Sequence, residues 1–328
     1  MSSEMNELIS AMNEHLAVKD EHGRVVLQVA MIATVYFEDA YKREAREAVL
    51  SCCDDYFKRC GAHLRWALNP DTRYPEPFGK GKGSNPHAWL PAQEEDERFM
   101  LTYHGGEHAD SASSFSLEAL GIERRPFVEL GYFKVSFPLL SLAKDPGLVP
   151  DVLLEICRKL KPVSGYAGIG IIESQNSSIE SKYAPVVYSW AQRLPGLEVD
   201  CPASHSIYLV NGREGGQGGI KGVNWLTVIA DRWLAELGGA DVVAARVTAL
   251  DPRFIIHRFD GGVMIQAGPR PDLDHDAEQG LWPELYVKLA KYLKPIRITM
   301  TGSFGYGGPG VRFDREHAQA WLRRFDQR

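Results

Sequence analysis

The sequence predicts an α+β protein, built as two degenerate α+β repeats with mainly antiparallel sheets covered by helices. Runs rich in β-branched and aromatic residues alternate with segments of helical periodicity. Several strand-like runs follow one another with only short turns between them, which is typical of antiparallel pairing. Two helical segments with matching ends also recur 133 residues apart, at Pro150 and Pro283, within a similar order of elements.

Length and composition indicate a large folded protein. Its 328 residues, 44% of them hydrophobic, can build a sizeable core. A net charge of −6 and a pI near 6.0 argue against nucleic-acid binding, which normally needs a basic surface. Residues 1–18 carry three glutamates and no signal-peptide core, and no apolar run has the length of a membrane span, so we expect a cytoplasmic protein. The five cysteines lack C-x-x-C spacing, which favours reduced thiols.

The first half is expected to span residues 21–195, after a polar N-terminal segment at 1–20. A short polar helix at 5–16 precedes a buried strand at 24–37, whose apolar run is too continuous for an exposed strand. Residues 70–98 contain five prolines and a glycine-lysine segment, which predicts a long exposed loop. The other expected elements are a helix at 39–60, a strand with one exposed face at 63–68, strands near 98–104, 113–118 and 129–138, a helix at 149–161, a strand at 165–173 and a helix at 177–193.

The second half, residues 196–328, is expected to open with a strand at 206–211 and a glycine-dense loop that leads into a helix. Asn224 suits the N-cap position, and the two glycines at 238–239 suit a helix end, since glycine adopts left-handed conformations without strain. Four residues recur at helical spacing and would face the core: Trp225, Ile229, Trp233 and Leu237. The following elements are strands at 241–250, 254–259 and 263–267, a helix at 282–293, a strand at 296–301 and a helix at 314–325.

The glycine-dense loop does not match the phosphate-binding motifs. A P-loop needs a hydroxyl directly after its lysine, and Gly222 follows Lys221 here. The dinucleotide fingerprint lacks its third glycine in register. We therefore expect a structural loop or a partner-facing surface, and no cofactor.

An internal repeat links the two halves. Residues 148–162 and 281–295 each carry proline in the first turn with an acid beside it, and each ends on Leu-Lys-Pro before an expected strand. The elements before the two segments also follow a similar order. We therefore predict a degenerate duplication, in which residues 215–239 correspond to the region around 40–61.

One segment fits the H-x-x-E-H pattern of zinc peptidases through His104, Glu107 and His108. Both histidines would need helical spacing to bind one zinc ion. The two glycines between them are poor helix formers, and an expected strand precedes the segment, so a polar turn is the preferred interpretation. A zinc-dependent hydrolase remains the alternative function.

An acidic segment at 272–276 resembles the start of a calcium loop. Ala277 stands where that loop requires glycine, and Pro283 stands where it requires the bidentate glutamate. We therefore expect an acidic, solvated loop and no metal site. The sequence also has no G-x-S-x-G motif, so no catalytic residues are expected.

Residues 219–227, with the sequence GIKGVNWLT, and the Leu-Gly-Gly that follows resemble the type VI immunity family. The resemblance extends from the strand at 24 to the strand at 296. It implies a cytoplasmic, non-enzymatic protein that binds and neutralises a nuclease toxin of the restriction-endonuclease fold, delivered by the type VI secretion system. Such a protein would cover the toxin's active site or prevent its catalytic assembly, and the family supplies no catalytic residues.

Acidic side chains are the expected contacts with this toxin. A nuclease binds DNA through basic groups, so acidic loops would speed association and block the substrate together. The first candidates are Glu94, Glu95, Asp96 and Glu97, and the second are Asp272, Asp274 and Asp276.

Overall fold

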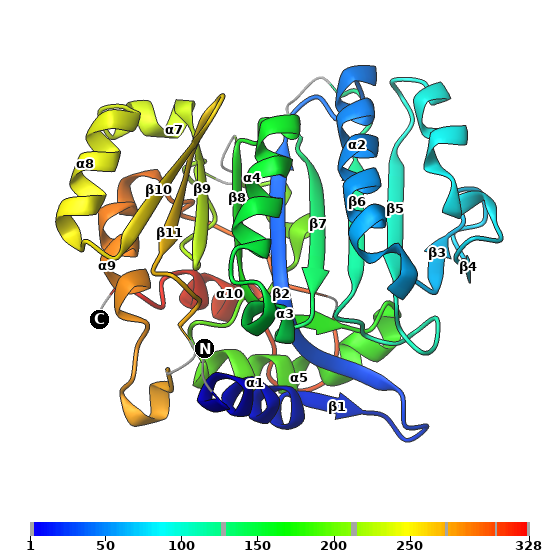
Figure 1. The fold of residues 1–328 in the computed structure, drawn as a ribbon, viewed down its shortest axis with the longest axis horizontal. Helices are drawn as coiled ribbons and strands as arrows, with labels where there is room; N and C mark the ends of the chain where they lie inside the picture. The colour runs from blue at the N-terminus through cyan, green and yellow to red at the C-terminus, as the bar shows by residue number, and fades with distance from the viewer. Residues whose placement is uncertain (1–2, 126–128, 211–214, 273–274, 306, 327–328) are drawn as a thin grey trace.

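A computed structural model describes residues 3–125, 129–210, 215–272, 275–305 and 307–326. One eleven-stranded sheet crosses the molecule in the order β10-β11-β9-β8-β2-β7-β6-β5-β3-β4, and β1 pairs with β2 at one end (Figure 1). The paired strands are antiparallel, and helices flank the sheet. The predicted α+β class with mainly antiparallel strands is therefore confirmed.

The strands lie mostly in the first half of the chain. They are β1 Ala17–Lys19, β2 Val25–Phe37, β3 Trp66–Leu68, β4 Pro75–Pro77, β5 Phe99–His104, β6 Ser116–Gly121, β7 Gly131–Phe137, β8 Ser164–Glu173, β9 Leu226–Ala230, β10 Phe254–Phe259 and β11 Gly262–Ala267. The long strand β2 pairs with β7 on one side and β8 on the other. Its near-continuous apolar sequence suits this position, because both of its faces are covered.

The α-helices are α1 Ser3–His15, α2 Arg43–Cys60, α3 Leu140–Lys144, α4 Leu148–Leu160, α5 Ser177–Arg193, α6 Pro202–Ser206, α7 Asp231–Glu236, α8 Ala240–Leu250, α9 Glu284–Tyr292 and α10 Arg315–Leu322. Short 3₁₀ turns occupy Gly61–His63, Lys82–Ser84, Pro86–Ala88, Leu90–Ala92, Ala277–Gln279 and Lys294–Ile296. In the described part of the chain, no helix combines the length and the apolar content needed to cross a bilayer.

The two faces of the sheet are covered differently. Helices α2 and α4 lie on one face, where Tyr56 and Ile156 pack against Phe133 and Val135 of β7 (Figure 1). Helices α5 and α6 contact β2 and β7 from the other face, where Tyr36 of β2 meets α6. The part of that second face formed by β3, β5 and β6 lines an open groove.

Most elements of the first half agree with the sequence prediction. The strand at 24–37, the helices at 149–161 and 177–193, and the strands at 98–104, 129–138 and 165–173 are confirmed within a few residues. Strand β6 begins three residues later than expected, and α2 begins at Arg43. The strand at 63–68 is reduced to β3, whose middle residue, Ala67, is buried between two partly exposed neighbours.

The prediction of a long exposed loop at 70–98 is confirmed for most of its residues, which are exposed or half-buried, and wrong for a few. The segment has no α-helix and forms β4 and three 3₁₀ turns, as its prolines suggest. Trp89 and Leu90 are nevertheless buried, and their 3₁₀ turns contact helix α2. Gly83 is packed so closely that an added Cβ would lie 2.2 Å from the carbonyl oxygen of Leu68. The segment is therefore folded onto the sheet instead of extending into solvent.

The segment 215–239 is not a loop followed by one helix. Leu226–Ala230 forms strand β9, which pairs with β8 on one side and β11 on the other. Asn224 caps no helix, because its Oδ1 accepts a hydrogen bond from the neighbouring Trp225 N–H at 2.7 Å. A strand between two neighbours is buried on both faces, so its continuous apolar run prevails over the helical spacing. The two glycines after helix α7 do adopt positive φ angles of 98° and 94°.

Three more strand predictions in the second half are wrong. Residues 241–250 form helix α8, because Val243 and Val247 lie one turn apart and are both buried. The strand expected at 206–211 is replaced by α6, which starts at Pro202, and a turn; residue 211 lies outside the described residues. The strand expected at 296–301 is reduced to a parallel bridge between Ile220 and Arg297, because a 3₁₀ turn takes up residue 296. The hairpin at 260–262 and the helices at 282–293 and 314–325 are confirmed.

The proposed halves, 21–195 and 196–328, share one sheet. Strand β8 of the first half pairs with β9 of the second. The echoed segments form helices α4 and α9, as expected. In the predicted duplication, β2 and α2 of the first half now match β9, α7 and α8 of the second. The counterpart of residues 40–61 is then about 231–250 instead of 215–239. The duplication itself stays a prediction.

Candidate functional site

An open groove of about 970 Å³ lies on the face of the sheet opposite α2 and α4. Strands β3, β5, β6 and β7 supply its floor. The end of β8, the start of α5 and residues 200–203 form its other wall. We refer to this cavity as the sheet groove.

A row of polar side chains runs across the floor of the sheet groove. Thr102 pairs with Glu118, Glu118 with Lys134, Lys134 with Thr34, and Thr34 with Tyr166. Directly paired residues of antiparallel strands point to the same face, so these five side chains form one line. The line begins in the open groove and ends in the buried centre of the sheet.

A parallel row of larger apolar side chains lies two residues away. Met100 pairs with Leu120, and Leu120 pairs with Tyr132. All three side chains line the sheet groove. The floor therefore combines a polar stripe and an apolar stripe, an arrangement that can hold a ligand with both kinds of group.

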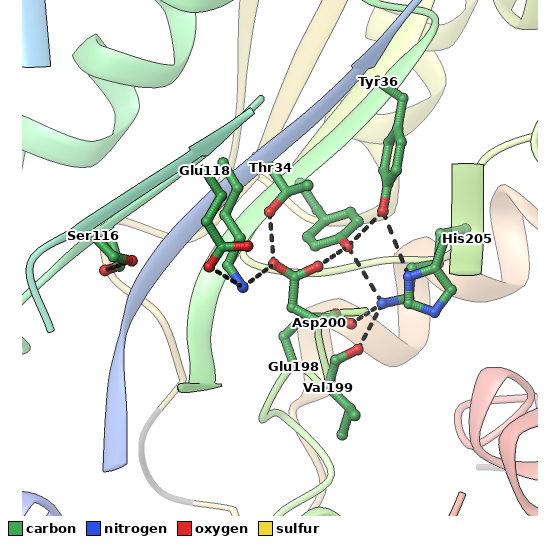
Figure 2. Close-up of polar contacts among 12 residues, drawn as sticks. Thr34, Tyr36, Ser116, Glu118, Glu198, Val199, Asp200 and His205 are labelled. Carbon is green, nitrogen blue, oxygen red and sulfur yellow. Dashed lines mark hydrogen bonds and ion pairs between the residues drawn. The ribbon is translucent and has the colours of Figure 1, made fainter. Parts of the chain in front are cut away.

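Asp200 organises the buried end of the polar row (Figure 2). It accepts hydrogen bonds from the Tyr166 hydroxyl at 2.5 Å and the Thr34 hydroxyl at 2.8 Å. The Lys134 ammonium lies 3.4 Å from Asp200 and 3.8 Å from Glu118. Burial favours the neutral acid, but Lys134, Lys221 and the two hydroxyl donors outweigh it and lower the pKa of Asp200.

The Lys134 ammonium stays charged. Burial acts to lower its pKa, but the carboxylates of Glu118 and Asp200 outweigh burial and raise the pKa of Lys134 above its ordinary value. One ammonium thus faces two carboxylates at the floor of the groove. The local charge is negative.

A second buried ion pair lies behind Asp200. The Lys221 ammonium is 2.5 Å from Glu198, donates to the Val199 carbonyl at 2.8 Å, and lies 3.4 Å from the Tyr166 hydroxyl. Burial lowers the pKa of Lys221, and Glu198 opposes this shift. The Asn224 amide donates to the other oxygen of Glu198 at 2.9 Å. Lys221 and Asn224 therefore hold one carboxylate from both sides.

This arrangement explains residues 219–227. Their lysine and asparagine fix Glu198, and the Trp225 indole donates to the Gly268 carbonyl at 3.0 Å. Three aromatic rings surround the Lys221 ammonium, with centroids at 4.8 to 5.6 Å. The segment is a buried scaffold. Sequence reasoning missed Glu198, Asp200 and Lys134, because Lys134 lies on β7, far from the segment that carries the two acids, and none of them falls in a motif.

The H-x-x-E-H segment does not have the geometry of a zinc site. His104 is the buried last residue of β5, and its Nδ1 accepts a hydrogen bond from the Gly106 N–H. Burial lowers the pKa of His104 to about 4. Glu107 and His108 are exposed on the following turn, so the helical spacing that zinc would need is absent. Among the described residues, no three His, Cys, Asp or Glu side chains are gathered as metal ligands.

The first predicted acidic contacts lie outside the sheet groove. Glu94, Glu95, Asp96 and Glu97 are exposed, as expected of a solvated segment. The Glu95 carboxylate pairs with Arg124 at 3.0 Å, and the Glu97 carboxylate accepts from the Glu94 N–H at 2.9 Å. Their role in toxin binding stays a prediction.

The second predicted acidic contacts have different surroundings. Asp276 is buried, accepts from the Glu278 N–H at 2.9 Å as a helix cap, and lies 3.1 Å from Arg193. Asp272 is half-buried, near the buried His275. Asp274 lies outside the described residues. The contacts of Asp276 give it a structural role whether or not a toxin binds nearby.

Comparison with known proteins places this geometry in a family. A solved structure, the Pseudomonas aeruginosa T6SS protein PA0821, is similar with a TM-score of 0.83 and 25% sequence identity, over 98% of this chain and 90% of that chain. No curated protein sequence matches. The family model described as type VI immunity for VRR-NUC matches residues 48–325, which include the scaffold segment 219–227. The resemblance seen in the sequence is confirmed, and the chain belongs to this type VI immunity family.

Proposed function

We propose that this chain binds a cognate VRR-NUC nuclease toxin in the cytoplasm and neutralises it without catalysis. The observation that carries the proposal is the immunity family model, which spans residues 48–325. The cognate toxin would be the restriction-endonuclease-fold effector that the sequence resemblance implies. It would arrive through the type VI secretion system.

The chemistry of the buried cluster supports binding over turnover. A general base or nucleophile needs a free, reactive form within reach of a substrate. Asp200 is instead held by two hydroxyl groups and an ammonium, and Lys221 is held by Glu198. Burial also raises the pKa of Tyr166 well above its ordinary value, which keeps that hydroxyl protonated. These groups stiffen the sheet behind the groove, and a preorganised surface lowers the entropic cost of binding.

Charge supports a nuclease as the partner. The chain carries 43 acidic and 37 basic residues, and a protein that cuts DNA offers basic groups along its substrate path. Opposite charges speed the encounter of two proteins. The bound immunity protein would then cover the toxin's active site or prevent its catalytic assembly.

Co-expression tests the proposal directly. The product of the gene beside that of this chain is produced in the bacterial cytoplasm alone and together with this chain. We expect killing in the first case, survival in the second, and a stable complex on purification. If no complex forms and no protection appears, the proposed function is wrong.

Two exposed substitutions separate this function from the hydrolase alternative. Glu107→Gln and His108→Ala alter the H-x-x-E-H segment without disturbing buried contacts. An inhibitor that acts by binding elsewhere keeps full protection in both variants. A zinc hydrolase would lose its activity, because its metal ligand or its general base is missing. Loss of protection in stable, folded variants would therefore favour the alternative.

DNA competition distinguishes the two routes of inhibition. A chain that covers the active site competes with DNA, so excess duplex weakens the complex between a catalytically inactive nuclease and the chain. A chain that blocks assembly leaves DNA binding intact while cleavage stops. We expect competition, because the acidic chain and DNA would seek the same basic surface.

A further inference from the structure

We infer that the sheet groove is the docking site for a basic segment of the nuclease, whose arginine or lysine side chains meet Glu118 and Glu173. This inference rests on the proposed function, since the nuclease is the occupant. It places the contact on the open face of the sheet and away from the exposed acidic segment 94–97.

The charge balance of the sheet groove favours a cation. Its lining includes five carboxylates and three basic side chains: Asp110, Glu118, Glu173, Glu180 and Asp200, against Arg73, Arg98 and Lys134. Two of these bases are already engaged, since Arg98 lies 3.2 Å from Glu123 and Lys134 is shared between Asp200 and Glu118. Asp110 lies 3.4 Å from Arg24, and Asp200 accepts two hydroxyl hydrogen bonds. Glu118 and Glu173 are therefore the carboxyl groups best placed for an arriving cation.

Glu118 is the better placed of the two carboxylates around Lys134. It lies 3.8 Å from the ammonium, whereas Asp200 lies at 3.4 Å and also accepts two hydroxyl hydrogen bonds. The Glu118 side chain is 21% exposed and that of Asp200 is fully covered. Glu118 can thus accept a new charge-assisted hydrogen bond without breaking an existing short one.

Glu173 is the second acceptor. It ends strand β8 at the wall of the groove, and its carboxylate has no hydrogen bond or ion pair within the described residues. Burial and the nearby Glu180 raise the pKa of Glu173 to about 8, against the opposing effect of Lys134. Glu118 and Glu173 both line the sheet groove, and both act to raise the pKa of Lys134. A basic segment could therefore place one cationic side chain against each acceptor.

The rest of the floor suits a polypeptide segment. The apolar stripe of Met100, Leu120 and Tyr132 runs beside the polar row. Tyr74 stands 74% exposed at the rim. A volume of about 970 Å³ is at the upper end of the range of about 300–1,000 Å³ seen for small-molecule pockets. Apolar and aromatic contacts around a buried charged anchor are the usual composition of an interface hot spot.

Affinity measurements on isosteric variants test the inference. A catalytically inactive form of the nuclease that passes the co-expression test is titrated with the wild-type chain and with Glu118→Gln, Glu173→Gln and Thr102→Arg. Glu118→Gln removes a charge without changing shape, and Glu173→Gln removes the carboxyl group that an incoming cation would ionise; we expect about a tenfold loss of affinity or more from each. Thr102→Arg puts bulk and positive charge into the floor, and we expect at least about a hundredfold loss.

Asp96→Asn tests the acidic segment 94–97 separately, and Glu236→Gln on α7 is the matched control. Glu236→Gln removes the same charge from an exposed acid that lies outside the groove and makes no hydrogen bond or ion pair within the described residues. We expect its affinity to stay within about twofold of the wild type, because an isolated exposed charge contributes little. Thermal unfolding of every variant shows whether a loss of affinity reflects the groove or a loss of folding.

Proton release gives an independent readout. With a pKa of about 8, Glu173 is about 90% protonated at pH 7, and an incoming cation would ionise it. Calorimetry in two buffers of different ionisation enthalpy is expected to show the release of close to one proton on binding. Glu173→Gln removes this release, which a purely structural role for Glu173 would not do.

The outcomes separate the two proposals. If the wild-type chain neither binds nor protects, the proposed function fails. If the wild type binds and the three folded groove variants bind equally well, the proposed function stands and the groove inference is overturned. If Asp96→Asn weakens binding while Glu118→Gln does not, the contact lies on the acidic segment 94–97 and the groove inference is overturned as well.

Discussion

Replacing Lys221 by methionine is expected to destabilise the whole fold, because it leaves Glu198 as a buried carboxylate without its cation. The Lys221 and Glu198 side chains are only 2% and 4% exposed, and their charged atoms lie 2.5 Å apart. Methionine has a similar volume but cannot donate a hydrogen bond. Glu198 would keep only the Asn224 amide at 2.9 Å. Removing one partner of a buried ion pair costs about 3–5 kcal/mol.

That cost converts into a measurable shift in Tm. An unfolding entropy of about 2.1 cal/mol/K per residue gives roughly 0.7 kcal/mol/K for 328 residues. A loss of 3–5 kcal/mol therefore lowers Tm by roughly 4–7 °C. Circular dichroism during heating at pH 7 measures the shift. Lys82→Met is the matched control, since its ion pair with Asp71 at 2.7 Å is exposed and such pairs contribute at most about 1 kcal/mol.

A double variant checks the cause. Adding Glu198→Gln to Lys221→Met removes the orphan charge and keeps an acceptor for the Asn224 amide. We expect this double variant to recover at least about half of the lost stability, because the two sites are directly coupled. A Tm of the Lys221→Met variant within about 1 °C of the wild type would refute the reasoning. A double variant less stable than the single one would show that Glu198 stabilises the fold through its other contacts.

Four further substitutions test the stability of the fold. Trp225→Ala empties a fully buried site and is expected to cost about 3–5 kcal/mol in urea unfolding. Gly168→Ala is expected to lower Tm, because its Cβ would lie 1.9 Å from the Asn224 Oδ1, whereas Gly222→Ala meets no atom within 4 Å and is expected to be neutral. The folded-state pKa of Glu173, about 8, lies above the ordinary value of a glutamate, so the wild type loses stability relative to Glu173→Gln as pH rises from 5 to 9. Urea midpoints across that range measure the difference.

The sequence predicts best those helices and strands whose structure is determined by residues close to them in the sequence. Strand β2 was found because thirteen residues, nearly all apolar, are too continuous for an exposed strand. Helices α4 and α9 were found from proline near the first turn and a Leu-Lys-Pro end. In such segments local propensity, capping and burial agree, so no distant contact is needed to choose between structures.

The wrong predictions of secondary structure fall on segments whose structure depends on contacts with residues distant in the sequence. Trp225, Ile229 and Trp233 recur at four-residue spacing, yet residues 226–230 form a strand between β8 and β11. A five-residue apolar run forms a strand instead of a helix only when both neighbouring strands, β8 and β11, are there to pair with it. The opposite error concerns helix α8, because residues 241–250 are predicted as a strand although Val243 and Val247 are buried at helical spacing. Short apolar runs carry too little information to separate the two periods.

The candidate site could not be predicted from the sequence for a different reason. Lys134 stands in a strand whose seven residues are all buried, and Thr34 is buried in β2. A charged residue in the middle of an apolar strand needs a partner, so Lys134 was the available signal. Its partners Glu118 and Asp200 lie on other elements. Sequence alone could therefore have indicated a buried ion pair, but not the groove beside it.

The family segment and the sheet groove are two ends of one polar network. Lys221 holds Glu198 and lies near the Tyr166 hydroxyl, Tyr166 donates to Asp200, and Asp200 faces Lys134, which in turn faces Glu118 in the groove. Loss of Lys221 would remove a cation that lowers the pKa of Asp200, and would thereby change the charge that Lys134 and Glu118 present to a ligand. A substitution at 221 can therefore weaken toxin binding without any contact at that position. Only variants with unchanged stability and a local charge change, such as Glu118→Gln, can locate the contact itself.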